Sequence, residues 1–250
     1  MRGFLAAIAF LTRIPVPAGA VDEGTLGRAA AFFPAVGALL GLLLAGVSMG
    51  AEALWHSPGV CSALVIVTLV LATGGLHMDG LMDTCDGIFG GRTAQRALEI
   101  MKDSRVGAFG ALGAMCVLLL KFGFISALTG DRAWKALILM PVVGRWALVY
   151  AIARFAYVRD VGTGRAFKEQ VAGRHLVWAS LLAAVIGAAL LQLRFVPVAI
   201  AVWLVAWATG RYVSAKLGGL TGDAYGAIAE VTEVVALAAI PLTATMVDAL

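Results

Sequence analysis

Residues 60–87 read VCSALVIVTLVLATGGLHMDGLMDTCDG, and this stretch decides how the chain is organised. An apolar run ends at a glycine pair, and Asp79, Asp83 and Asp86 follow at spacings of four and three residues. On a helix, at about 100° per residue, these aspartates fall within roughly 60° of one another. Like charges on one helix face repel, so we expect a cation to lie among the three carboxylates. Hard oxygen ligands suit Mg²⁺ or Mn²⁺, which usually bring a phosphate with them. The stretch therefore predicts a metal and phosphate site at the end of a membrane span, with a solvated acidic face as the alternative.

The composition outside this stretch is that of an integral membrane protein. Hydrophobic residues make up 61% of the chain and charged residues 14%, and the mean hydropathy is +0.94. Such values lie outside the range of soluble globular domains. Apolar stretches that approach the length needed to cross a bilayer, about 20 residues, are expected at Ala30–Met49, Val60–Gly75, Gly107–Leu128, Ala136–Ala156, Leu176–Leu193, Phe195–Gly210 and Val231–Ala249. We predict an all-α polytopic helical bundle of about six to seven transmembrane helices that forms a single domain over residues 1–250.

The basic residues predict the orientation of this bundle. With a cytoplasmic amino terminus, most of the 19 lysines and arginines fall on the cytoplasmic side. Arg132, Lys135 and Arg194 are the exceptions outside, while Lys121 and Arg145 lie within spans. This asymmetry favours a cytoplasmic amino terminus and polar segments that face the cytoplasm. We expect a multi-pass protein of the bacterial inner membrane. No basic helix or aromatic-basic alternation suggests a nucleic-acid partner.

The amino-terminal segment resembles a signal peptide in part. Arg2 precedes an apolar run over Phe4–Leu11, but Arg13, Pro15 and Pro17 interrupt the pattern before the small residues that follow. An interfacial or re-entrant segment is therefore favoured.

Two further polar segments are expected on the same side of the membrane as the aspartates. In the first, over residues 99–110, Lys102 and Arg105 are placed to contact anionic oxygens, and two glycines allow the backbone to approach a ligand closely. An ordinary salt-bridged helix is the alternative there.

The second segment, residues 220–233, carries Asp223, Glu230 and Glu233, which fall within about 80° on a helix. Glu230 and Glu233 enter an apolar span, where an unpaired carboxylate costs several kcal/mol, so each needs a partner. That partner is a metal, a substrate hydroxyl or an arginine, for which Arg145 is the candidate. His77 lies about 160° from the aspartate face of a regular helix, which favours a capping or interfacial role unless the glycine pair unwinds the turn.

The chain resembles the cobalamin synthase family, the adenosylcobinamide-GDP ribazoletransferases, over nearly its whole length. The matching motifs are residues 10–17 (FLTRIPVP), 33–37 (FPAVG), 77–87, 99–110 and 220–233, with a looser match over 144–154 and 162–164. Met78, Met82 and Cys85 stand where smaller or more usual apolar residues are expected.

The resemblance implies a Mg²⁺-dependent transferase that joins adenosylcobinamide-GDP to α-ribazole or its 5′-phosphate and releases GMP. A diphosphate substrate and an incoming hydroxyl need a metal, basic groups for the leaving phosphate and a base. On this basis the metal ligands are assigned to the three aspartates of residues 77–87, with the first or the last also a candidate base. The catalytic set is Asp79, Asp83, Asp86, Lys102 and Arg105, and the substrate-binding set is Arg13, Arg92, Asp103, Asp223, Glu230 and Arg154.

Two other classes of membrane protein remain open from the residues alone. A CDP-alcohol-type membrane phosphotransferase also uses clustered aspartates, but those enzymes carry Ala-Arg where Leu81-Met82 stands here. An ion-coupled transporter uses intramembrane carboxylates, but most acidic residues here are expected at span ends and no inverted repeat is visible. Membrane lipid is an expected partner, and the sequence leaves a homo-oligomer open.

Overall fold

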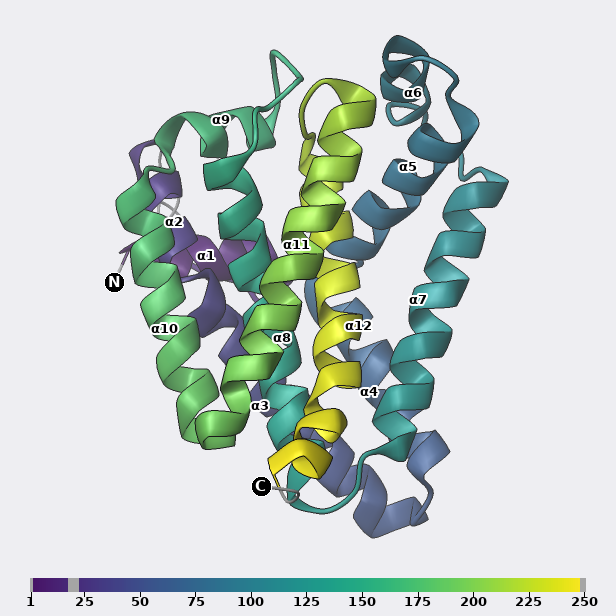
Figure 1. Cartoon of the computed structure of the whole chain (residues 1–250), viewed down its shortest axis with the longest axis vertical. Helices are drawn as coiled ribbons and strands as arrows, with labels where there is room; N and C mark the ends of the chain where they lie inside the picture. Colours follow the sequence, from purple (N-terminus) through teal and green to yellow (C-terminus); the bar gives the residue numbers. More distant parts are fainter. Residues whose placement is uncertain (1, 18–22, 248–250) are drawn as a thin grey trace.

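The computed structural model describes residues 2–17 and 23–247, and the chain is helical through most of both ranges (Figure 1). The helices are α1 (Arg2–Leu11), α2 (Leu26–Ala31), α3 (Phe33–Trp55), α4 (Pro58–Thr73), α5 (Leu76–Gly90), α6 (Ala94–Ile100), α7 (Ala108–Ala127), α8 (Asp131–Arg154), α9 (Thr163–Gln170), α10 (Gly173–Leu191), α11 (Phe195–Leu217) and α12 (Gly222–Val247). Within the described ranges the one sheet-like pairing is an isolated bridge between Tyr157 and Leu220.

The predicted membrane-spanning bundle is confirmed. Five helical stretches are long and apolar enough to cross a membrane, or up to six if the bent pair α4 and α5 forms one span. One of the five, Gly173–Leu217, contains both α10 and α11, and Figure 1 shows that these two helices run in opposite directions. The range of five to six overlaps the predicted six to seven. It is smaller at its lower limit because α4, which matches the second predicted span, has only 16 residues, and because α10 and α11 are counted as one stretch.

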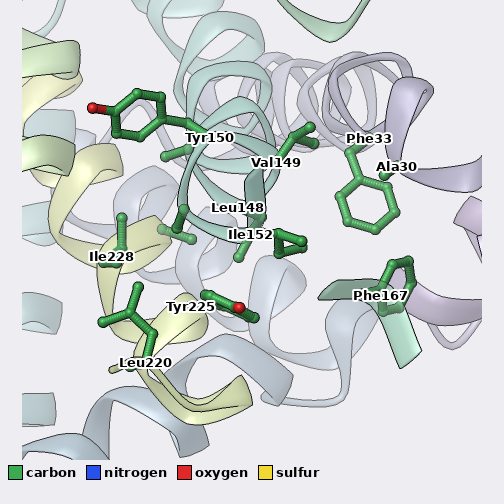
Figure 2. Packing of buried hydrophobic residues seen from close by; sticks show 14 of the residues in the cluster. Ala30, Phe33, Leu148, Val149, Tyr150, Ile152, Phe167, Leu220, Tyr225 and Ile228 are labelled. Carbon is green, nitrogen blue, oxygen red and sulfur yellow. The ribbon is translucent and has the colours of Figure 1, made fainter. Parts of the chain in front are cut away.

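Helix α8 lies at the centre of the bundle, where 89% of its most apolar 18-residue stretch is buried. Glycines on α3 allow its backbone to touch α8: an added Cβ at Gly37 would lie 2.4 Å from the carbonyl oxygen of Pro141, and one at Gly41 would lie 2.4 Å from the Cα of Ile138. Small residues at such contacts are typical of helices packed within membranes. Figure 2 shows the adjoining core, where Leu148 and Ile152 of α8 lie among side chains from α3, α9 and α12.

The polar segments gather at one end of the bundle. Figure 1 shows α6, α9 and the connection between α11 and α12 at the same end, with the last turns of α12 at the opposite end. Helix α1 has 10 residues, and at 1.5 Å per residue it reaches about 15 Å, half the thickness of a hydrocarbon core. It is therefore too short to cross, as expected for an interfacial segment.

Candidate functional site

A sharp bend between α4 and α5 places the aspartates. Gly74 and Gly75 both adopt left-handed backbone conformations, with φ of 63° and 72°, which glycine adopts without the steric cost of a Cβ. The two helices meet at 90°. After the bend, Asp79 is exposed, Asp83 is half-buried and Asp86 is buried. The predicted helix over the aspartates is present, but its three carboxylates have different surroundings.

Asp86 holds the start of α7. Its carboxylate accepts hydrogen bonds from the backbone N–H groups of Gly107 and Gly110, both at 2.8 Å. An added Cβ would lie 2.3 Å from Asp86 Oδ1 at Gly107 and 2.4 Å from Oδ2 at Gly110. A carboxylate at a helix amino terminus satisfies free N–H groups and complements the helix dipole. The two glycines thus make room for Asp86, and its carboxylate positions α7 through these hydrogen bonds. Its assignment as a metal ligand stays a prediction.

A second helix, α12, completes the acidic site. An added Cβ on Gly80 of α5 would lie 2.6 Å from the carbonyl oxygen of Asp223, so the two helix starts are in contact. The hydroxyl of Thr221 accepts a hydrogen bond from Ala224 N at 3.1 Å, which caps α12. The negative charges of Asp223 and Asp79 both act on the carboxyl group of Asp83. Three acidic side chains from two helices therefore share one neighbourhood.

Arg159 is the cation of this neighbourhood, and it was not among the predicted site residues. Its Nη2 lies 2.8 Å from Asp223 Oδ2 and 3.2 Å from the carbonyl oxygen of Met101. The backbone N–H of Val158 donates to Leu220 O at 2.9 Å, which ties the segment carrying Arg159 to the start of α12. The looser sequence match just after Arg159, over residues 162–164, was the one signal that pointed to this segment.

A cavity of about 270 Å³ lies between α5, α9 and α12. Asp79, Asp223 and Arg159 form its charged part, and His77 and Thr163 also line it. Its aromatic part consists of Phe10, Phe33, Tyr157, Phe167 and Tyr225. Partial burial raises the pKa of the Tyr157 phenol, so this group is a neutral hydrogen-bonding partner near neutral pH. The cavity combines acidic groups, one guanidinium and a wall rich in aromatic rings.

Arg13 borders a second hollow, of about 560 Å³, which Asp79 also lines. The Arg13 side chain crosses Gly74 so closely that an added Cβ there would lie 2.0 Å from its Nε. The structure therefore brings Arg13 and Asp79 to one hollow, as expected if both contact one substrate.

The structure does not bring the predicted basic groups Lys102 and Arg105 to these two cavities. Arg105 turns to Asp103, with Nη2 2.6 Å from Oδ2. The bonds from Arg105 lower the pKa of the exposed Asp103 carboxyl to about 2. Lys102 is also exposed.

The other predicted substrate-binding residues on this side lie apart as well. Arg92 and Arg154 are exposed and line neither cavity. Of the predicted basic groups, the described structure thus places Arg13 alone beside an aspartate of the site.

Glu230, which was predicted to bind substrate, lies in a buried ion network and lines neither cavity. Its carboxylate is 2.7 Å from Lys121 Nζ of α7, and the residue is 5% exposed. Lys121 also bonds Glu233, which in turn pairs with Arg145 of α8. Ion pairing inside the bundle thus satisfies both glutamates, but Lys121 supplies the partner of Glu230 where Arg145 was the candidate.

His77 belongs to the same network. It is 4% exposed, and its Nδ1 lies 3.3 Å from Nη2 of Arg145. The N-cap residue of α5 is Gly75 and not His77. His77 is therefore neither the cap of α5 nor an interfacial residue, and the exception allowed for the glycine pair applies. The bend at the glycine pair turns the first residues of α5 into the bundle, and His77 also borders the cavity.

The acidic groups fit a metal that arrives with a substrate. Across residues 2–17 and 23–247, no three histidine, cysteine, aspartate or glutamate side chains form a ready-made metal site. Mg²⁺ usually keeps several waters and binds one or two carboxylates together with substrate phosphates. Asp79, Asp83 and Asp223 concentrate negative charge beside the cavity, while Asp86 is engaged by backbone N–H groups. The donor set suits Mg²⁺ with a bound phosphate, and the metal assignment stays a prediction.

Comparison with known proteins supports the family resemblance over nearly the whole chain. The chain is 41% identical over 247 residues to the adenosylcobinamide-GDP ribazoletransferase of Roseiflexus sp. (strain RS-1), covering 96% of this chain and 89% of that protein. It is 41% identical over 230 residues to the protein of that name from Desulforamulus reducens, covering 91% of each. No solved structure matches the chain. The family model described as cobalamin-5-phosphate synthase matches residues 3–241, and the chain belongs to this family.

Proposed function

We propose that this protein is an adenosylcobinamide-GDP ribazoletransferase that acts with Mg²⁺ at the cytoplasmic face of the inner membrane. A ribose hydroxyl of α-ribazole or its 5′-phosphate attacks the phosphorus that is esterified to cobinamide. The new P–O bond forms as the bond to the phosphate of GMP breaks, and GMP leaves with that bridging oxygen. The observation that carries this proposal is the junction of α5, α9 and α12, where acidic groups, Arg159 and an aromatic wall share one cavity.

Asp79 is the best-placed base for the hydroxyl proton. Both the first and the last aspartate of the motif were candidates, but Asp86 accepts two backbone hydrogen bonds and is buried. Asp79 is exposed and borders both cavities. A general base must lie within hydrogen-bond reach of the proton it removes, and Asp79 alone of the motif aspartates lines the space that a substrate can enter.

Asp83 and Asp223 hold the charge that a metal would balance. When bound there, Mg²⁺ would neutralise the diphosphate and make its phosphorus easier to attack. Arg159 keeps Asp223 in place through their ion pair, and its guanidinium is a further donor for a phosphate oxygen. Arg13, on the other side of Asp79, supplies a second guanidinium for the leaving phosphate.

The two cavities suit the two substrates differently. The cavity of about 270 Å³ has a wall of aromatic rings, and Tyr157 and Tyr225 have ring centroids 6.0 Å apart. Such a wall favours a flat heteroaromatic base, so we assign this cavity to the base of α-ribazole. The corrin ring with its side chains is too large for it. The more open hollow beside Arg13 and Asp79 is therefore assigned to the GDP-activated corrinoid.

Family membership weighs against the two other classes. Neither a CDP-alcohol-type phosphotransferase nor an ion-coupled transporter releases GMP from a GDP-activated corrinoid. The decisive experiment incubates the purified protein with adenosylcobinamide-GDP, α-ribazole and Mg²⁺ and measures GMP and the joined corrinoid by chromatography. Equal amounts of both products are expected. GMP without the joined product, or no GMP at all, would refute the proposed reaction.

The cytoplasmic location has its own test. Cysteines placed at Thr93, beside α6, and at Ser57, between α3 and α4, are labelled in intact cells with a membrane-impermeant thiol reagent. The proposed orientation predicts that the Ser57 variant is labelled from outside and the Thr93 variant only after permeabilisation. The native cysteines are replaced by serine first, because Cys116 is exposed.

A further inference from the structure

A groove on the flank of the bundle lies apart from the site described above. It has a volume of about 880 Å³ and runs between the α1–α2 pair and α10. Three arginines line it, namely Arg2, Arg28 and Arg174. An added Cβ at Gly3 would lie 3.3 Å from the carbonyl oxygen of Arg28, so α1 touches α2 there and holds the first two arginines near each other. None of the described lining residues is acidic.

The rest of the groove is apolar and follows one face of α10. Trp178, Leu181 and Val185 line it at spacings of three and four residues beyond Arg174, which places all four side chains on one helix face. These apolar side chains are between 52% and 67% exposed. Charge is thus confined to one end of the groove, and the surface that continues from it is hydrophobic.

The length of this face matches one leaflet of a bilayer. From Arg174 to Val185 the helix rises about 16 Å at 1.5 Å per residue, and half of a hydrocarbon core is about 15 Å. Trp178, one turn below Arg174, stands where tryptophan is enriched at the membrane interface. A guanidinium binds phosphate oxygens in pairs, so the arginines at the charged end are suited to a lipid phosphate.

The geometry points to a binding site for an anionic phospholipid, whose phosphate contacts the arginines and whose acyl chain follows α10. The charge and the depth of the groove both favour this occupant. A second copy of the chain would bring six arginines to one contact, and their repulsion opposes it. Basic pockets between helices on the cytoplasmic side of membrane proteins bind lipid headgroups in this way.

The experiment measures lipid binding directly and does not depend on the proposed activity. The protein in a neutral detergent is titrated with phosphatidylglycerol, phosphatidylcholine or inorganic phosphate, and bound lipid is counted by native mass spectrometry. The test variant Arg28→Gln/Arg174→Gln is compared with the control Arg211→Gln/Lys216→Gln. The control removes the same charge from exposed positions at the end of α11, near the same end of the bundle (Figure 1).

We expect the unmodified protein to bind phosphatidylglycerol at least about tenfold more tightly than phosphatidylcholine, from the attraction of several basic groups to one headgroup. The test variant should lose about tenfold in phosphatidylglycerol affinity, while the control changes less than about twofold. Equal binding of both lipids, or equal losses in the two variants, overturns the inference. If inorganic phosphate displaces the lipid, the arginines bind a free anion. If the protein forms a dimer without lipid, the groove binds a second copy of the chain. Either result overturns the inference. The comparison of lipids on the unmodified protein stands even if the test variant fails to fold.

Discussion

Replacing Asp86 by asparagine should weaken the fold, whereas replacing Asp79 in the same way should weaken catalysis. The Asp86 carboxylate accepts two backbone hydrogen bonds at 2.8 Å. Asparagine keeps one acceptor oxygen and turns an N–H group toward the second donor. The loss of one charge-assisted bond costs about 1.5–3 kcal/mol, and the lost charge at the α7 amino terminus adds up to about 1 kcal/mol.

The assay is thermal unfolding of the purified protein in detergent, followed by tryptophan fluorescence. For a chain of this size, a loss of about 1.5–4 kcal/mol corresponds to a fall in Tm of roughly 3–16 °C. Asp79→Asn is the matched control, since Asp79 is exposed; its Tm should stay within about 1 °C while kcat falls at least about 100-fold. An unchanged Tm for Asp86→Asn together with a kcat loss as large as that of Asp79→Asn would refute the reasoning and return Asp86 to the metal site.

Four more perturbations test the surrounding contacts. Asp83→Asn should lower turnover at least about 100-fold at limiting Mg²⁺, measured as GMP release, because a neutral amide cannot balance a cation. Arg159→Lys should reduce kcat/KM about 10–100-fold, because an ammonium cannot grip Asp223 and a phosphate together. Lys121→Met should cost about 3–5 kcal/mol in unfolding experiments, because it leaves two buried carboxylates without their shared cation. Arg105→Ala should return the Asp103 carboxyl, seen by NMR, from a pKa of about 2 to its ordinary range. The pKa of Asp103 is depressed in the folded state. The ion pair therefore contributes to the free energy of unfolding above about pH 4, and this contribution is lost as the pH falls through about 2.

Each of these predictions has an outcome that contradicts it. Normal turnover of Asp83→Asn at limiting Mg²⁺ would remove this residue from the metal site. An Arg159→Lys enzyme with unchanged kcat/KM would show that charge alone is needed at that position. A Lys121→Met protein as stable as the unmodified one would mean that Glu230 and Glu233 are held by other groups, and an Asp103 pKa unaffected by Arg105→Ala would rule out the pair as its cause.

The sequence alone determined the class of fold and the location of the acidic motif. Long apolar runs can satisfy their backbone hydrogen bonds in a bilayer only as helices or closed barrels, so composition and run length were enough to predict a helical bundle. The spacing of Asp79, Asp83 and Asp86 was enough to predict a helix with acidic side chains on one side. These features are local, because each depends on neighbours within one or two turns.

Only the tertiary structure decided which helix each of these side chains meets. Periodicity fixes the angle between Asp79 and Asp86 on α5, but the packing of α7 and α12 against α5 decides that one borders a cavity and the other caps a helix. The same holds for Lys121 and Glu230, which are 109 residues apart, and for His77 and Arg145, which are 68 apart. Each of these buried polar groups needs a partner because the bundle excludes water. The sequence indicates that a partner is needed but does not identify it. Which candidate satisfies this need depends on how helices distant in the chain pack together, and that is set by contacts such as those at Gly80 and Gly110.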